Sequence, residues 1–70
     1  MELIKFDKEY INTRYIISIH EPRKTDSDSW EIMIITAGNK YPCYTWNFSS
    51  QFEAEQEYKK LVDNFANFVV

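Results

Sequence analysis

Residues 30–48, WEIMIITAGNKYPCYTWNF, contain two strand-forming runs joined by the only glycine of the 70-residue chain. Every position in residues 30–36 except Glu31 is apolar, aromatic or β-branched, as in a strand whose two faces are both largely buried. Gly38 and the asparagine after it form a turn signal, because both residue types accept the left-handed backbone of hairpin turns. We therefore predict a β-hairpin in which residues 40–48 return antiparallel to residues 30–36.

Alternation along this hairpin assigns its side chains to two faces. The aromatic row of the returning strand consists of Tyr44, Trp46 and Phe48. We expect this row to lie opposite one of two rows of residues 30–36, which are Trp30, Ile32 and Ile34 on one face and Glu31, Met33 and Ile35 on the other. Pro42 lacks the N–H that a ladder requires, so that end of the returning strand is predicted to lie at an edge or a bulge.

A helix is predicted after the hairpin, over residues 50–67. Ser50 and Glu53 fit a capping box, in which the hydroxyl accepts from the amide three residues on and the glutamate reaches back. The apolar residues that follow recur at helical spacing and form one stripe: Ala54, Tyr58, Leu61, Phe65 and Phe68. This stripe is expected to pack on one face of the sheet.

Two further strands are predicted before the hairpin. Residues 10–20 alternate between two faces, with Ile16 as the only break, and this pattern predicts a half-buried strand. Residues 21–29 are rich in turn formers and predict an exposed loop, while residues 2–6 predict a short first strand. The fold class is therefore α+β: a single domain, residues 1–70, with a three- or four-stranded antiparallel β-meander and one C-terminal helix packed on one face.

One helix covers only one face of such a sheet. The other face is expected to hold Tyr41 and Cys43 together with a row from each neighbouring strand, several isoleucines among them. A large exposed apolar patch is unfavourable in a soluble monomer. We therefore expect this face to be buried against a second copy of the chain, as a homo-oligomer, or against another protein.

Composition limits the chemistry that the chain can perform. One cysteine, Cys43, and one histidine, His20, supply neither an intrachain disulfide nor a Cys/His zinc site, and a single glycine excludes a phosphate-binding loop. We predict no catalytic, metal-binding or cofactor-binding residues. The net charge of −3 and the pI near 5.0 argue against nucleic acid and anionic membranes as partners. No signal peptide or spanning segment is predicted, so a cytoplasmic location is expected.

The predicted partner-binding residues are polar or aromatic side chains of the strands and loops, namely Tyr10, Arg14, Tyr15, Arg23, Lys24, Asp26, Asp28 and Tyr41. The main hypothesis is a non-catalytic protein-binding module. The alternative is a binder of single-stranded nucleic acid or nucleotides, which would use exposed tyrosines and the basic residues of the N-terminal half. A protein that mimics DNA through its acidic residues is a further, lesser alternative.

Three segments, YINTRYIISI, WEIMIITAGNKY and NFSSQFEAEQEYKKL, follow one another over residues 10–61. This order resembles that of very small bacterial and bacteriophage accessory proteins, in which a β-meander precedes one C-terminal helix. Many proteins of this type bind and block a host protein. The resemblance therefore implies an inhibitor or adaptor that occupies the surface of a host or bacterial protein.

Overall fold

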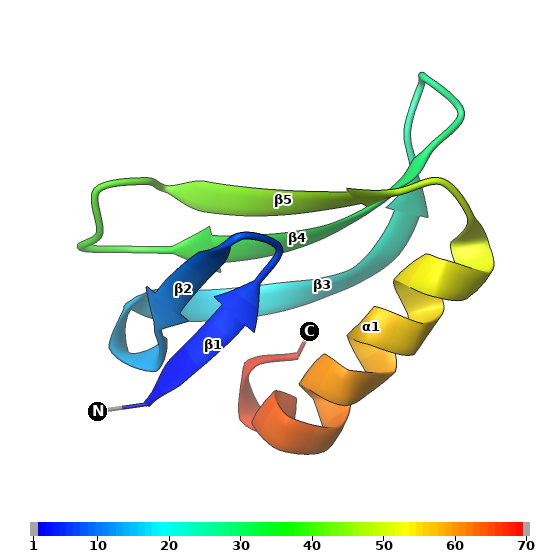
Figure 1. The fold of residues 1–70 in the computed structure, drawn as a ribbon. Coiled ribbons are helices and arrows are strands. Elements are labelled where there is room, and N and C mark those ends of the chain that lie inside the picture. The colour runs from blue at the N-terminus through cyan, green and yellow to red at the C-terminus, as the bar shows by residue number, and fades with distance from the viewer. Residues whose placement is uncertain (1, 70) are drawn as a thin grey trace.

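The computed structural model describes residues 2–69 of the chain. Its elements in chain order are β1 (Leu3–Phe6), β2 (Glu9–Asn12), the 3₁₀ turn η1 (Thr13–Tyr15), β3 (Ile16–Lys24), β4 (Trp30–Thr36), β5 (Cys43–Phe48), α1 (Gln51–Phe65) and the 3₁₀ turn η2 (Ala66–Phe68). β3, β4 and β5 form an antiparallel sheet in that order, while β1 and β2 form a separate antiparallel hairpin (Figure 1). The predicted α+β class, with an antiparallel sheet and one C-terminal helix, is confirmed.

The predicted hairpin of residues 30–48 forms with a continuous register between β4 and β5. The aromatic row of β5 lies opposite the first of the two rows considered, in the pairs Trp30↔Phe48, Ile32↔Trp46 and Ile34↔Tyr44. The turn is longer than predicted, because β5 begins at Cys43 and residues 37–42 form the connection. Pro42 lies just outside the strand and accepts the Thr36 N–H through its carbonyl at 2.9 Å.

The single strand predicted over residues 10–20 is wrong, because the structure divides this segment into β2 and β3. The Asn12 side chain accepts the Arg14 N–H at 3.0 Å and so caps η1 between the two strands. The carbonyl of Tyr15 in this turn accepts the Ala37 N–H at 2.8 Å. As a result β2 pairs with β1, whereas β3 pairs with β4.

The loop predicted over residues 21–29 is shorter in the structure, because β3 continues to Lys24. Arg23 lies opposite Glu31 and forms a 2.8 Å ion pair with it, which holds the end of the strand against β4. A register shift between His20 and Arg23 accommodates Pro22 within β3. A second shift lies between Ile16 and Ser18.

The helix begins where the capping box predicts, with Ser50 as the N-cap. The Ser50 hydroxyl accepts the Glu53 N–H at 3.2 Å and donates to the Glu53 carboxylate at 3.1 Å, while Ser49 donates to the same carboxylate at 2.8 Å. α1 ends at Phe65, short of the predicted residue 67, because the backbone of Phe65 leaves the helical region at φ −137° and ψ 42°. η2 follows, and Val69 then forms a parallel bridge to Ile19.

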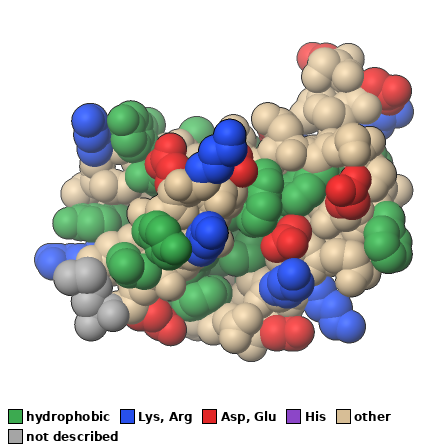
Figure 2. Space-filling view, viewed as in Figure 1, with side chains coloured by type: hydrophobic (Ala, Val, Ile, Leu, Met, Phe, Trp, Pro, Cys, Tyr) green, Lys and Arg blue, Asp and Glu red, His purple; other side chains and the backbone are tan. Residues whose placement is uncertain are grey.

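The core lies on one face of the sheet, beneath two covers rather than the helix alone. Its buried side chains come from β1, β2, the first half of β3, β4 and α1. They are Ile4, Phe6, Ile11, Ile16, Ile19, Ile32, Ile34 and Leu61. The ring of Phe6 meets Trp46 edge-on, with centroids 5.4 Å apart and planes at 83°. Hydrophobic side chains are visible between the hairpin and the helix in Figure 2. The β1–β2 hairpin therefore covers part of the sheet face that the sequence predicts to be covered by the helix alone.

Candidate functional site

The face of the β3–β4–β5 sheet opposite the core carries three rows of side chains, because directly paired residues point to the same side of a sheet. The rows follow from the observed register and are Ser18–Ile35–Cys43, His20–Met33–Thr45 and Arg23–Glu31–Asn47. We call these nine residues the open face. Both described covers of the sheet, α1 and the β1–β2 hairpin, contribute their buried residues to the opposite side.

The open face has an apolar centre and a polar rim. Met33 and Ile35 lie half-buried in the middle strand and form this centre. Ile17, at the first bulge of the outer strand β3, is 58% exposed and lies outside the nine residues. Around the centre the Ser18 hydroxyl and His20 Nε2 lie 2.8 Å apart, and Arg23 pairs with Glu31. An apolar centre within a polar rim is the arrangement that protein interfaces adopt.

This face is less apolar than the sequence analysis expected. Of the six isoleucines in β3 and β4, four are buried in the core: Ile16, Ile19, Ile32 and Ile34. Ile35 lies on the open face, and Ile17 is exposed at the first bulge of β3. Tyr41 lies outside β5, in the connection before it. The drive to bury the open face is therefore weaker than predicted.

A second group of residues gathers at the end of the sheet where η1 meets the β4–β5 connection. We call Arg14, Tyr15, Lys40 and Tyr41 the tyrosine end. The Arg14 guanidinium carbon lies 5.4 Å from the centre of the Tyr15 ring, and Lys40 Nζ lies 5.4 Å from that of Tyr41. In Figure 2 basic and hydrophobic side chains lie next to one another on the left of the molecule, where this end is found.

The tyrosine end is built from two acid-free stretches of sequence. Residues 10–20 and 32–52 contain no aspartate or glutamate. The Ala37 N–H donates to the Tyr15 carbonyl at 2.8 Å, and this bond joins the two stretches. The two stretches bring the cations Arg14 and Lys40 to this end, although Glu2 lines the groove beside Arg14.

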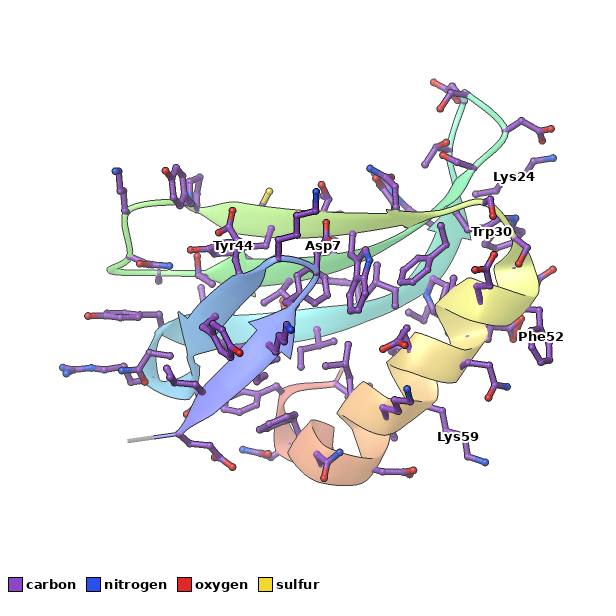
Figure 3. All side chains as sticks on the ribbon, in the orientation of Figure 1. Asp7, Lys24, Trp30, Tyr44, Phe52 and Lys59 are labelled. Carbon is purple, nitrogen blue, oxygen red and sulfur yellow. The ribbon has the colours of Figure 1, made fainter. Side chains whose placement is uncertain are left out.

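The eight predicted partner-binding residues occupy three separate places. Arg14, Tyr15 and Tyr41 belong to the tyrosine end, where the Ala37–Tyr15 hydrogen bond joins their two segments, whereas Tyr10 lies on β2 with Lys5 Nζ 5.9 Å from its ring. The remaining four lie at or beside the β3–β4 connection: Arg23 and Lys24 end β3, and Asp26 and Asp28 lie in the connection itself. Arg23 also belongs to the open face, and Figure 3 shows Lys24 at the end of the sheet away from the Tyr44 label.

Charges at the β3–β4 connection largely offset one another. Lys24 Nζ lies 3.1 Å from Asp28, and Arg23 is paired with Glu31.

The sequence analysis missed Lys40, which completes the tyrosine end, and the open-face residues Met33 and Ile35. Lys40 had a local signal, since it precedes Tyr41, but the open face required the strand register.

His20 and Cys43 do not form a nucleophile–base pair. They lie on β3 and β5, on either side of β4, so two strand spacings of nearly 5 Å each separate their strands. Among residues 2–69 no group of three or more His, Cys, Asp or Glu side chains is arranged to hold a metal ion.

On the other side of the sheet, partial burial, together with the nearby charge of Glu21, raises the pKa of Tyr58.

Membrane insertion through a helix is not supported by the described part of the chain, since none of its helices is long and apolar enough to span a bilayer. Comparisons with protein-family models, with curated proteins and with solved structures found no match to this chain.

Proposed function

We propose that this chain is a non-catalytic module that binds another protein through the open face. The observation that carries the proposal is the one-sided cover of the sheet: α1 and the β1–β2 hairpin pack on the same side, and Met33 and Ile35 are left on the other. The expected partner presents an apolar patch with a polar surround, because the open face itself has an apolar centre and nearly balanced rim charges.

The proposal extends to the biological role. The resemblance to small bacterial and bacteriophage accessory proteins favours an inhibitor or adaptor that occupies the surface of a host protein. A cytoplasmic setting is part of the same proposal, and it agrees with Cys43 being exposed and unpaired, since free thiols persist where the compartment is reducing.

Comparative capture from a bacterial lysate tests this function. Met33→Lys places a charge at the centre of the open face, whereas Phe52→Lys places the same charge on α1, where Phe52 is 72% exposed and labelled in Figure 3. We expect one protein to be retained by the wild-type chain and by Phe52→Lys but lost from Met33→Lys, with circular dichroism confirming that both variants fold. A protein retained equally by all three chains would contradict the open face as the binding surface.

Binding of single-stranded nucleic acid is the second candidate, favoured by the tyrosine end. Exposed aromatic rings beside cations are what such ligands require, and Arg14 and Lys40 each lie next to a tyrosine. A groove of about 520 Å³, lined in part by Asn12, Thr13 and Arg14, adjoins this end. Glu2 lines the same groove, so anion binding is expected to be weak.

Titration of a fluorescently labelled oligonucleotide at low salt separates the two candidates. A nucleic-acid binder would show saturable binding that weakens steeply as salt rises and that is lost in the double variant Arg14→Ala/Lys40→Ala. The Met33→Lys variant serves as the control, because its substitution lies on the open face. Absence of saturable binding to the wild-type chain would remove the second candidate.

A further inference from the structure

The two outer strands of the β3–β4–β5 sheet differ in how their free edges are protected. β3 has two register shifts, contains Pro22, ends in two basic residues, and is bridged by Val69. Bulges, proline and charge are devices that keep an edge strand from pairing with another chain. β5 has none of them, since its six residues, CYTWNF, are uncharged and pair with β4 without a shift.

The backbone groups on the free edge of β5 follow from one hydrogen bond. The Thr36 N–H donates to the Pro42 carbonyl at 2.9 Å, which fixes the phase of the ladder. Because antiparallel residues alternate between the two edges of a strand, the groups of Tyr44, Trp46 and Phe48 point to β4. Those of Cys43, Thr45 and Asn47 point outward, and no hydrogen bond from these outward groups to any part of residues 2–69 is found.

We propose that two copies of the chain associate by antiparallel pairing of their β5 strands around a two-fold axis at Thr45, which joins both sheets into one. Only residues whose backbone groups point outward form hydrogen bonds across such a contact. With the axis at Thr45, each outward-facing residue of one β5 lies opposite an outward-facing residue of the other. Thr45 lies opposite Thr45 of the other copy, and Cys43 lies opposite Asn47, with two N–H···O bonds in each pair.

The same register is favourable for the side chains. Tyr44 of one copy lies opposite Trp46 of the other, an aromatic cross-strand pair, and the two threonines on the axis also form a favourable pair. No charged residue of β5 opposes another, so like-charge repulsion does not resist self-pairing. A contact of one six-residue strand is smaller than a standard interface, and the dimer is therefore micromolar or weaker.

Sedimentation analysis of the purified chain, from low micromolar to millimolar concentration, tests the pairing. Thr45→Pro removes an outward N–H without breaking the β4–β5 ladder, so it is expected to weaken dimerisation about tenfold or more. Thr45→Ala keeps the N–H and is the matched control, with less than about a fivefold change. Thr45→Lys places two ammonium groups opposite each other and leaves the backbone intact. Because the Thr45 side chain lies on the open face, Met33→Lys is its control, and that variant is expected to dimerise as the wild-type chain does.

Disulfide formation tests the register. Asn47→Cys brings a thiol opposite the native Cys43 of the other copy, at a Cα separation of about 5.5 Å, within the range of disulfides. Under oxidation this variant is expected to form a covalent dimer. The wild-type chain and the double variant Cys43→Ser/Asn47→Cys are not, because each then lacks one thiol of the facing pair.

The proposal concerns the purified chain alone, so its outcome is independent of whether a protein partner binds the open face. A wild-type chain that is monomeric over the whole concentration range would overturn it. So would a dimer that responds alike to Thr45→Pro and Thr45→Ala but is lost with Met33→Lys, because that result places the contact on the side chains of the open face and not on the backbone edge of β5. A disulfide through Cys43 of both copies would exclude the Thr45-centred register.

Discussion

Truncation of Phe6 measures how far the β1–β2 hairpin contributes to the stability of the whole chain. The Phe6 side chain is 1% exposed and packs edge-on against Trp46 of the main sheet. Replacement of a buried phenylalanine by alanine costs about 3–5 kcal/mol, which includes the cavity that it leaves. A chain of 70 residues is expected to have a free energy of unfolding of about 4–10 kcal/mol. Phe6→Ala should therefore remove about 30% or more of that stability.

Urea unfolding followed by circular dichroism and tryptophan fluorescence provides the assay. Phe6→Leu keeps most of the volume and is expected to lose about 1 kcal/mol, so it remains measurable if Phe6→Ala does not fold. Phe52→Ala, at a side chain that is 72% exposed, should change the free energy of unfolding by less than about 0.5 kcal/mol. A loss below about 1 kcal/mol for Phe6→Ala would refute the shared core, because it would mean that the hairpin contributes little to the stability of the chain.

Three other substitutions test local features of the fold. Ser50→Ala removes the N-cap of α1 and should lower the free energy of unfolding by about 1 kcal/mol in thermal or urea unfolding, whereas Ser49→Ala, which loses only a bond to the Glu53 carboxylate, should cost less. Gly38→Ala should cost about 1 kcal/mol because Gly38 has φ +72°, and Gly38→Asn should recover much of this loss; equal stabilities would contradict the strained turn. The pKa of Tyr58 is raised in the folded state, so its contribution to stability is full below about pH 10 and is lost as pH rises through the folded-state pKa. Above pH 10 the thermal midpoint of Tyr58→Phe should therefore fall less than that of the wild-type chain.

The elements that the sequence predicts well are those with strong local signals. β4 was predicted with its observed bounds, because residues 30–36 are almost uniformly strand-forming. The start of α1 was predicted from Ser50 and Glu53, since a capping box is a contact between residues three apart. Both features depend on neighbours in the sequence and are insensitive to the rest of the fold.

The division of residues 10–20 depends on contacts that a local pattern does not contain. Side chains alternate through Asn12 and Tyr15 much as they would in an unbroken strand, and Ile16 was the only irregularity. The turn is held by the Asn12 cap and by the bond from Ala37, which is distant in sequence. Without this turn the β1–β2 hairpin, the second cover of the core, was not foreseen.

The candidate surfaces were predicted only in part for a related reason. Residue type favours both Tyr15 and Tyr41 as exposed aromatic residues, but their position at the same end of the sheet follows from the bond between Ala37 and Tyr15. Conversely, Lys24 and Asp28 were selected as partner-binding residues, yet in the structure they are paired with each other. Residue type identified candidates, whereas only the tertiary structure grouped them.

The separation of the backbone into two hydrogen-bonded sheets has a consequence for motion. The β1–β2 hairpin and the β3–β4–β5 sheet are joined by η1 and by buried side chains, not by a common ladder. The hairpin is therefore able to lift away while every strand pairing of the main sheet stays intact, at the cost of exposing Ile4, Phe6 and Ile11. Amide protons of β1 and β2 would then exchange with solvent through this partial opening. Amide protons of β4, which is paired on both sides, would exchange only when the whole chain unfolds.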